Sequence, residues 1–313
     1  MKIVYFGTSE FAIPALKALL DSRHEVVAVV TQPDRKKGRD LKLSPSPVKI
    51  FASSRSIPIY QPVDASNPES ARYLKSLEAD LFVVISFGQI LKENILNVPK
   101  IFAVNVHGSL LPKYRGAAPI NRAIINGDRS TGVTVIKMNA RMDEGDIILK
   151  EEININYDDT NVSLSKKLSE LGALTLMKVI ALIETKGRDI PVSKQHPSLV
   201  TYAAKLKKSD GLINWKEPAL TIHNKVRGLL PWPGAYTNYD GKVLKVLKTD
   251  LVKEIFLEGI PGEVLAASAA EGIIVKTGSG AISIRCVQPE GKKEMNSGSF
   301  LLGHKIKKGY QFK

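Results

Sequence analysis

Asn105 and His107 end an apolar run, IFAVNVH (101–107), that is typical of a buried strand. Successive side chains of a strand alternate between its two faces, so Asn105 and His107 project in the same direction. An amide donor beside an imidazole can stabilise an oxyanion and transfer protons. Because ligands of open α/β sheets bind just beyond the carboxyl ends of the strands, we expect a site at this edge.

The segment that follows this strand, GSLLPKYRGAAPI (108–120), contains two glycines and two prolines. Glycine has no Cβ, so its backbone amides and carbonyls can approach a ligand closely. The sequence therefore predicts a ligand-binding loop directly beside the Asn/His pair.

Three acidic residues, Asp143, Glu144 and Asp146, lie in NARMDEGDI (139–147), after the apolar run TGVTVIKM (131–138). If that run forms a strand beside the Asn/His strand, the acidic loop falls at the same edge of the sheet. A carboxylate there can hold His107 in one tautomer and favour its protonated form. The spacing does not distinguish Asp143 from the other two acids.

Other kinds of catalytic site fit the sequence less well. Ser109 lies near His107 but has no G-x-S-x-G context, so a nucleophilic triad is not indicated. FGTSEF (6–11) has one glycine where a dinucleotide-binding loop needs three. The remaining histidines have no metal-ligand spacing, and we expect no metal. An amide, an imidazole and a carboxylate suit acyl transfer between two bound substrates.

The elements that must position these residues alternate between apolar strands and amphipathic helices, which indicates a mainly parallel α/β sheet covered on both faces. A helix is expected over 9–21, and a long helix from an Asp159-Thr160 cap to about Thr185. The expected strands are 2–6, 24–32, 81–86, 101–107 and 131–138.

Short alternating runs punctuated by Gly, Asp and Pro follow Gly211 and predict a smaller antiparallel β-barrel of the oligonucleotide-binding type. We expect a catalytic domain over 1–189, a linker over 190–208 and the barrel over 209–313. Cys286 is expected to pack in a strand. Trp215 and Trp232 are expected to be core or packing residues rather than platforms for base stacking.

The net charge of +14 is concentrated towards the C-terminus, where residues 190–313 hold 19 Lys and Arg against 10 Asp and Glu. Such a basic module suits a polyanionic partner, and binding through phosphates should weaken steeply with salt. No apolar run reaches the roughly 18 residues that a membrane span needs. The start, MKIVYFGTSEF, has no secretory pattern, so we expect a cytoplasmic protein with no membrane contact.

Several motifs, in this order and spacing, resemble the methionyl-tRNA formyltransferase family over nearly the whole chain. NVHGSLLPKYRGAAPI is typical of formyltetrahydrofolate-using enzymes as a group. The loop TQPDRKKGRDLKLSPSPVK and the C-terminal segment NWKEPALTIHNKVRGLLPWPGAY narrow the resemblance to the tRNA enzymes. They are FGTSEFAIPAL, TQPDRKKGRDLKLSPSPVK, NVHGSLLPKYRGAAPI, TGVTVIKM, MDEGDI and NWKEPALTIHNKVRGLLPWPGAY.

The resemblance implies an N-terminal Rossmann-like domain that transfers a formyl group from 10-formyltetrahydrofolate to methionyl initiator tRNA. It implies Asn105, His107 and Asp143 as the catalytic residues, which selects Asp143 among the three acids. The amine of the methionyl group would attack the formyl carbon, and Asn105 and His107 would hydrogen-bond the oxyanion. We also expect a monomer.

The resemblance also implies which residues bind the two substrates. In the pterin-binding segment, Phe87 stands where many relatives have a tyrosine, which removes a hydroxyl. The implied folate-binding residues are Ser109, Leu110, Leu111, Pro112, Phe87 and Gly88. The basic loop 33–49 contains Gly38 and three prolines, which argue against regular structure. The implied tRNA-binding residues lie in this loop and in the basic second domain. They are Arg35, Lys36, Lys37, Arg39, Lys42, Lys207, Lys208 and Arg227.

Other functions remain as alternatives. A sugar-nucleotide formyltransferase has the same two-domain layout but does not need the basic loop and basic second domain. A glycinamide ribonucleotide formyltransferase is a single domain. A folate hydrolase would release formate without an acceptor, and a non-catalytic RNA-binding protein would lack one of the three catalytic residues.

Overall fold

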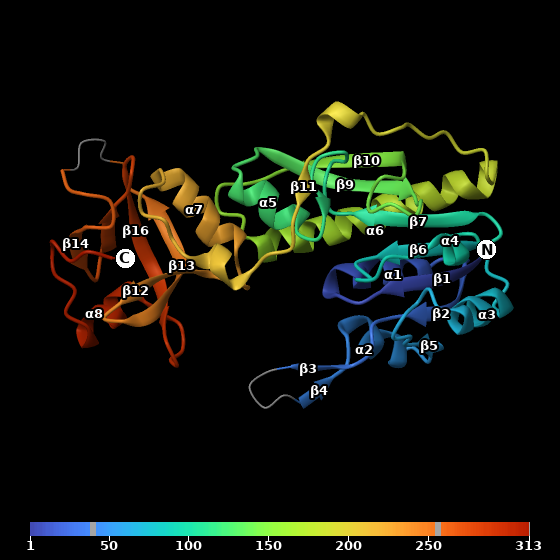
Figure 1. Cartoon of the computed structure of the whole chain (residues 1–313), viewed down its shortest axis with the longest axis horizontal. Coiled ribbons are helices and arrows are strands. Elements are labelled where there is room, and N and C mark those ends of the chain that lie inside the picture. Colours follow the sequence, from blue (N-terminus) through green and yellow to red (C-terminus); the bar gives the residue numbers. More distant parts are fainter. Residues whose placement is uncertain (38–41, 254–257, 313) are drawn as a thin grey trace. The chain divides into compact units, whose positions relative to one another are not determined.

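The computed structural model describes residues 1–37, 42–253 and 258–312, which form two compact units (Figure 1). We call them the N-terminal and C-terminal units. The N-terminal unit comprises Met1–Pro119, Ser130–Asn154 and Ser165–Ala203, and the C-terminal unit comprises Ile120–Arg129, Ile155–Leu164 and Ala204–Lys313.

The N-terminal unit is built on a seven-stranded sheet with the order β10-β9-β7-β6-β1-β2-β5. The pairs from β7 to β5 are parallel, and β9 and β10 are antiparallel additions at one edge. The Rossmann-like, mainly parallel sheet expected from the sequence is thus confirmed. The strands are β1 Lys2–Gly7, β2 Glu25–Val30, β5 Ile59–Tyr60, β6 Leu81–Ile85, β7 Phe102–His107, β9 Ser130–Lys137 and β10 Asp146–Asn154.

Helices connect these strands, and the predicted long helix is confirmed as α6 Asn161–Lys186. A short sheet pairs β8 Arg115–Gly116 with β11 Tyr202–Ala203. The other helical elements are η1 Glu10–Ala12, α1 Ile13–Leu20, α2 Pro47–Ser53, α3 Pro68–Ser76, α4 Glu93–Leu96, α5 Pro119–Ile125 and η2 Pro197–Leu199.

The two faces of β7 have different neighbours. Val106 points to α6, where Gly172 packs so closely that an added Cβ would lie 3.1 Å from Val106 Cγ1. Side chains alternate along a strand, so Asn105 and His107 point to the opposite face. One face of the strand is therefore used for packing, and the other is left for polar contacts.

The basic loop 33–49 is more regular than predicted. β3 Arg35–Lys37 and β4 Lys42–Ser44 form an antiparallel hairpin, and α2 begins at Pro47. The prolines do not prevent this, because Pro33 and Pro45 lie outside the paired residues and Pro47 occupies the first helical position, where no N–H is needed. Ser46 caps α2 by accepting a hydrogen bond from the Lys49 amide.

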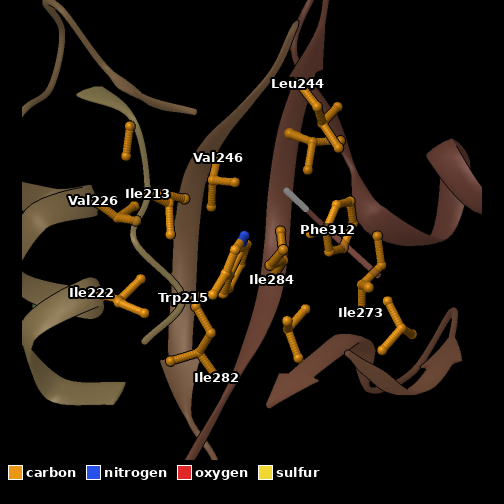
Figure 2. Close-up of a cluster of buried hydrophobic side chains, with 14 of the residues drawn as sticks. Ile213, Trp215, Ile222, Val226, Leu244, Val246, Ile273, Ile282, Ile284 and Phe312 are labelled. Carbon is orange, nitrogen blue, oxygen red and sulfur yellow. The ribbon is translucent and has the colours of Figure 1, made fainter. Parts of the chain in front are cut away.

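The C-terminal unit contains an antiparallel sheet with the order β12-β13-β16-β15-β14, which confirms a second domain of antiparallel strands. Its interior is filled from both the sheet and α7 Ala219–Gly228, as Figure 2 shows for Trp215, Ile222 and Ile284. The remaining elements are η3 Lys208–Gly211, β12 Ala235–Tyr239, β13 Lys242–Leu251, β14 Val264–Ser268, β15 Gly272–Lys276, β16 Ala281–Pro289, β17 Met295–Asn296 and α8 Ser297–Gly303.

The two tryptophans differ in burial. Trp215 is buried, stacks on Phe312 at 5.7 Å and donates its Nε1–H to Thr237 Oγ1 at 3.1 Å, as expected of a core residue. Trp232 is 55% exposed, so it is a surface residue and not part of the core. It lies between Pro231 and Pro233 in the segment that joins α7 to β12, which is surface chain rather than a regular element.

Two segments from the first half of the chain pack in the C-terminal unit. Asn121 donates to the Gly228 carbonyl at 2.7 Å, and Asn161 donates to the Leu230 carbonyl at 3.0 Å. Each compact unit is thus made of several chain segments, whereas the predicted domains are continuous, with boundaries near residues 189 and 209. Those boundaries remain a prediction.

Within the described residues, no helix combines the length and apolarity that crossing a membrane would require.

His223 in the C-terminal unit should make stability depend on pH. Its ring stacks on Tyr157, its Nδ1 lies 3.0 Å from Thr249 Oγ1, and burial, aided by the charge of Arg227, lowers its pKa from 6.5. A lowered pKa means that the folded state binds fewer protons than the unfolded state. The contribution of His223 is therefore complete above about pH 6.5 and is lost as pH falls towards the folded-state pKa.

We expect His223→Asn to flatten the fall in unfolding free energy between about pH 7 and pH 5 relative to the unmodified protein. Denaturant unfolding at a series of pH values measures this slope. His196→Asn, at an exposed histidine, is the control. An unchanged slope in His223→Asn would contradict the assignment.

Candidate active site

Asn105 and His107 lie at the carboxyl end of β7, in the middle of the sheet rather than at its margin. Asn105 pairs in register with Val84 of β6 and with Ile136 of β9, and His107 pairs with Thr134 of β9. His107 is buried and Asn105 is half-buried. The strand geometry places both side chains on one face, as the alternation predicted.

Asp143 joins this pair. Its Oδ1 accepts a hydrogen bond from Asn105 Nδ2 at 3.4 Å and lies 3.6 Å from His107 Nδ1. Its Oδ2 accepts from the Gly116 amide at 2.8 Å. One carboxylate, 14% exposed, thus joins β7 to the loop that follows it.

The chain brings Asp143 to Asn105 and His107 by a different path from the one that the sequence predicted. β9 is antiparallel to β7, with Lys137 opposite Val104, so the acidic loop leaves β9 beside the start of the β7 pairing and not beyond His107. The expectation that strand adjacency alone puts this loop at the same edge is wrong, because it assumed parallel strands. The loop 138–145 instead turns back towards β7, with Asp143 in a left-handed conformation at φ +54°.

Both ring nitrogens of His107 face protein groups. Nε2 lies 2.9 Å from the Tyr114 carbonyl oxygen, which can only accept, so the proton is on Nε2. Nδ1 faces the Asp143 carboxylate. Asp143 and the Tyr114 carbonyl together fix the orientation of the ring.

The predicted folate-binding loop packs against β9. Thr134 Oγ1 donates to the Ser109 carbonyl at 2.7 Å and accepts from the Leu111 amide at 3.0 Å. Ser109, Leu111 and Pro112 are buried, whereas Leu110 is half-buried. The structure therefore fixes the backbone of this loop next to Asn105 and His107. Contact of these four residues with folate remains a prediction.

The second predicted folate segment follows β6. Phe87 is 2% exposed and its ring packs edge-on against Phe6 at 5.4 Å, so the aromatic ring is part of the N-terminal core. Gly88 is exposed at φ +87°, and a Cβ there would meet nothing within 4 Å. Their predicted contacts with the pterin are not tested by this placement.

The basic hairpin is anchored at its base. Lys49 Nζ lies 2.8 Å from Asp34 Oδ2, Gln61 donates to Asp34 Oδ1, and these hydrogen bonds lower the pKa of Asp34. Arg35 donates to Gln32 Oε1 at 2.9 Å and, like Lys36, is exposed. Lys37 and Lys42 are paired residues of the hairpin, and Arg39 lies outside the described residues.

The predicted RNA-binding residues of the C-terminal unit are of two kinds. Lys207 and Lys208 are exposed around η3. Arg227 is half-buried, and its guanidinium donates to Asn224 Oδ1 and to the carbonyls of Asn156 and Asp159. These contacts give Arg227 a structural role, and its tRNA contact remains a prediction.

The sequence argument missed four contributors to the site. Arg115 and Gln195 contact the acidic loop, the Tyr114 carbonyl orients His107, and Thr134 fixes the 109–111 backbone. Arg115 lies within the segment 108–120, which the sequence had already indicated as a ligand-binding loop. Gln195 had no sequence signal, because it lay in the predicted linker.

The chemistry of the site needs no metal ligand set, and the described residues contain no group of three or more His, Cys, Asp or Glu able to hold one. The site consists of an amide donor, an oriented imidazole and a shared carboxylate on a Rossmann-like sheet. That arrangement, with its glycine-containing loop, is that of an acyl-transfer enzyme.

Comparison with known families specifies the group that is transferred. Residues 1–180 match the family described as "Formyl transferase", and residues 205–305 match "Formyl transferase, C-terminal domain". The fold and the site are therefore those of a formyl transferase.

Curated relatives narrow the family. The chain is 45% identical over 309 residues to the methionyl-tRNA formyltransferase of Geobacter sulfurreducens, covering 99% of this chain and 96% of that one. It is 46% identical over 310 residues to that of Caldanaerobacter subterraneus, covering 99% of both. The chain belongs to the methionyl-tRNA formyltransferase family.

Solved structures of more distant proteins share the fold. The sugar 3N-formyl transferase WlaRD, solved with dTDP and 5-N-formyl-THF, has a TM-score of 0.67 at 23% identity, with 94% of this chain and 99% of that chain covered. The N-formyltransferase of Helicobacter canadensis has a TM-score of 0.67 at 21% identity, with 90% and 98% covered.

The contact of His107 with Tyr114 predicts its tautomer. Long-range ¹H–¹⁵N correlation of the histidine rings should show a proton on Nε2 of His107, because the Tyr114 carbonyl accepts from it. His107→Gln identifies the signal. A His107 ring that carries its only proton on Nδ1 would contradict the observed orientation.

Proposed function

We propose that this protein transfers the formyl group of 10-formyltetrahydrofolate to the α-amino group of methionyl initiator tRNA. The observation that carries the proposal is the convergence of Asn105, His107 and Asp143 in a chain related at about 45% identity, over its whole length, to methionyl-tRNA formyltransferases. The first step of the chemistry is attack of the neutral amine on the formyl carbon.

Asn105 supplies the oxyanion donor. Its amide nitrogen carries two hydrogens and directs one towards Asp143, so the other can donate to the oxygen on which charge develops. Asp143 holds Asn105 and the His107 ring together, so both are fixed before the substrate arrives. A donor held in advance stabilises charge without reorganisation during the reaction.

Protons must move for the transfer to balance. The new C–N bond forms at the amine as the bond between the formyl carbon and folate N10 breaks, so the amine loses a proton and N10 gains one. Asp143 and His107 are the titratable groups that meet at this point, and the carboxylate orients the ring. We assign proton transfer to the pair of His107 and Asp143 acting through water, because both ring nitrogens of His107 face protein groups.

The residues fit a folate co-substrate in two respects. The 109–111 backbone is fixed beside the catalytic pair by Thr134, and Gly88 leaves open space at the end of β6. We assign Ser109, Leu110, Leu111, Pro112, Phe87 and Gly88 to the folate site. The bound folate would supply the formyl group.

We assign tRNA binding to basic residues of the hairpin and of the C-terminal unit. The hairpin carries Arg35, Lys36, Lys37 and Lys42 on a base that Asp34 and Lys49 hold together, and its segment also includes Arg39. Lys207, Lys208 and Arg227 are the proposed contacts of the C-terminal unit. We place the protein in the cytoplasm as a monomer, with a catalytic domain over 1–189, a linker over 190–208 and an RNA-binding domain over 209–313.

The proposed function predicts a specific acceptor. With 10-formyltetrahydrofolate as donor, charged initiator tRNA should be formylated far faster than charged elongator methionyl-tRNA or free methionine. Formyl transfer is followed with labelled donor, and a dTDP-linked amino sugar is tested in parallel. Transfer only to the amino sugar would replace the proposal by a sugar formyltransferase, and formate release without an acceptor would indicate a hydrolase.

Removing the oxyanion donor should slow transfer without unfolding the protein. We expect Asn105→Ala to reduce the single-turnover rate by about 100- to 1,000-fold, the usual loss for one such donor. Asn238→Ala, at an exposed residue of β12, is the matched control. A near-normal rate for Asn105→Ala would remove Asn105 from the mechanism.

A further inference from the structure

Residues 193–203, which we call the strap, run along both loops that carry the site. At one end, Ser193 and Ile147 exchange two backbone hydrogen bonds of 2.8 Å. At the other end, β11 pairs with β8. The Tyr114 amide also donates to Thr201 Oγ1 at 2.9 Å. The strap lies within the proposed linker 190–208 and belongs to the N-terminal unit, which extends to Ala203.

Gln195 is a strap residue that hydrogen-bonds the backbone of the acidic loop. Its Nε2 donates to the backbone carbonyls of Asp143 at 2.7 Å and of Gly145 at 2.8 Å. Its Oε1 accepts from Arg115 Nε at 3.0 Å. Two acceptors at one end of the amide and a cation at the other leave one orientation for the side chain.

Arg115 completes this arrangement. Its side chain is 7% exposed, and its Nη1 lies 2.9 Å from Glu144 Oε1. A buried guanidinium requires such partners, because an unpaired buried charge is strongly unfavourable. Arg115 therefore contacts the acidic loop directly through Glu144 and indirectly through Gln195.

The backbone of Asp143 needs this support. Asp143 is a residue other than glycine in the left-handed region, a strained conformation that persists where its surroundings enforce it. Gln195 binds the carbonyls on both sides of Glu144, so it fixes the loop at the residue whose side chain must reach Asn105, His107 and Gly116.

We propose that Gln195 is a positioning residue for formyl transfer, which acts through the backbone of Asp143 and is itself oriented by Arg115. The inference rests on the proposed function. Gln195 contacts the loop and not the carboxylate, so it should affect the rate of the chemical step and not the binding of either substrate.

Two substitutions separate the contacts of Gln195. Gln195→Met keeps the length of the side chain but removes every hydrogen bond. Gln195→Glu keeps an acceptor for Arg115 and places a carboxylate oxygen against the two carbonyls. Gln288→Met is the matched control, because the Gln288 side chain donates to the nearby Lys292 carbonyl within the C-terminal unit.

Steady-state rates with charged initiator tRNA and 10-formyltetrahydrofolate measure the effect. A displacement of about 1 Å in a catalytic group can cost about 100-fold, so we expect kcat to fall roughly 10- to 100-fold in both Gln195 variants. KM for each substrate should stay within about threefold. Gln288→Met should leave both parameters unchanged.

A double-mutant cycle tests whether Gln195 acts through Asp143. If it does, Gln195→Met should cause little further loss in an Asp143→Asn background. Losses that multiply, or an unchanged kcat in both single variants, would overturn the inference. So would a rise in KM without a fall in kcat.

Hydrogen exchange supplies a readout that does not depend on activity. Gln195→Met should speed exchange of the amides in 141–147, while the thermal unfolding midpoint stays close to that of Gln288→Met. Unchanged exchange in 141–147 would overturn the inference even if kcat fell. If the unmodified protein formylates no methionyl-tRNA, the proposed function fails, and exchange alone then decides whether Gln195 holds the loop.

Discussion

The site depends on a single carboxylate that joins two parts of the N-terminal unit. Asp143 contacts the two polar side chains at the end of β7 through one oxygen and the Gly116 amide through the other. A carboxylate with 14% exposure needs such partners, because burial of an unpaired charge is costly. Its contacts therefore fix the strand end, the loop after the strand and the acidic loop together.

Several contacts outside the site support this carboxylate. The strap binds the loop after β7 through Thr201 and the acidic loop through Gln195. Gln195 and Arg115 then hold the backbone on which Asp143 stands. On the other face of β7, α6 packs at Val106, so the strand that carries Asn105 and His107 is held from both faces.

The residues that we propose to bind RNA are built by a different principle. Exposed lysines and arginines are carried on short elements that the protein holds at their base, as Asp34 and Lys49 hold the hairpin. Charges that remain in water can bind phosphates without first losing protein partners. Arg227 illustrates the converse, since its guanidinium already serves three acceptors within the C-terminal unit.

The sequence by itself determined β1, β2, β6, β7 and β9 but not β5 or β10, together with the long helix, the antiparallel second domain and the placement of Asn105 and His107 on one face. These follow from hydrophobic periodicity and strand alternation, which are local properties. The family resemblance selected Asp143. Tertiary structure alone decided that β9 is antiparallel, that the hairpin forms, that Trp232 is exposed and that Gln195 reaches the acidic loop. Residues 143 and 195 are far apart in the chain, and only packing brings them together.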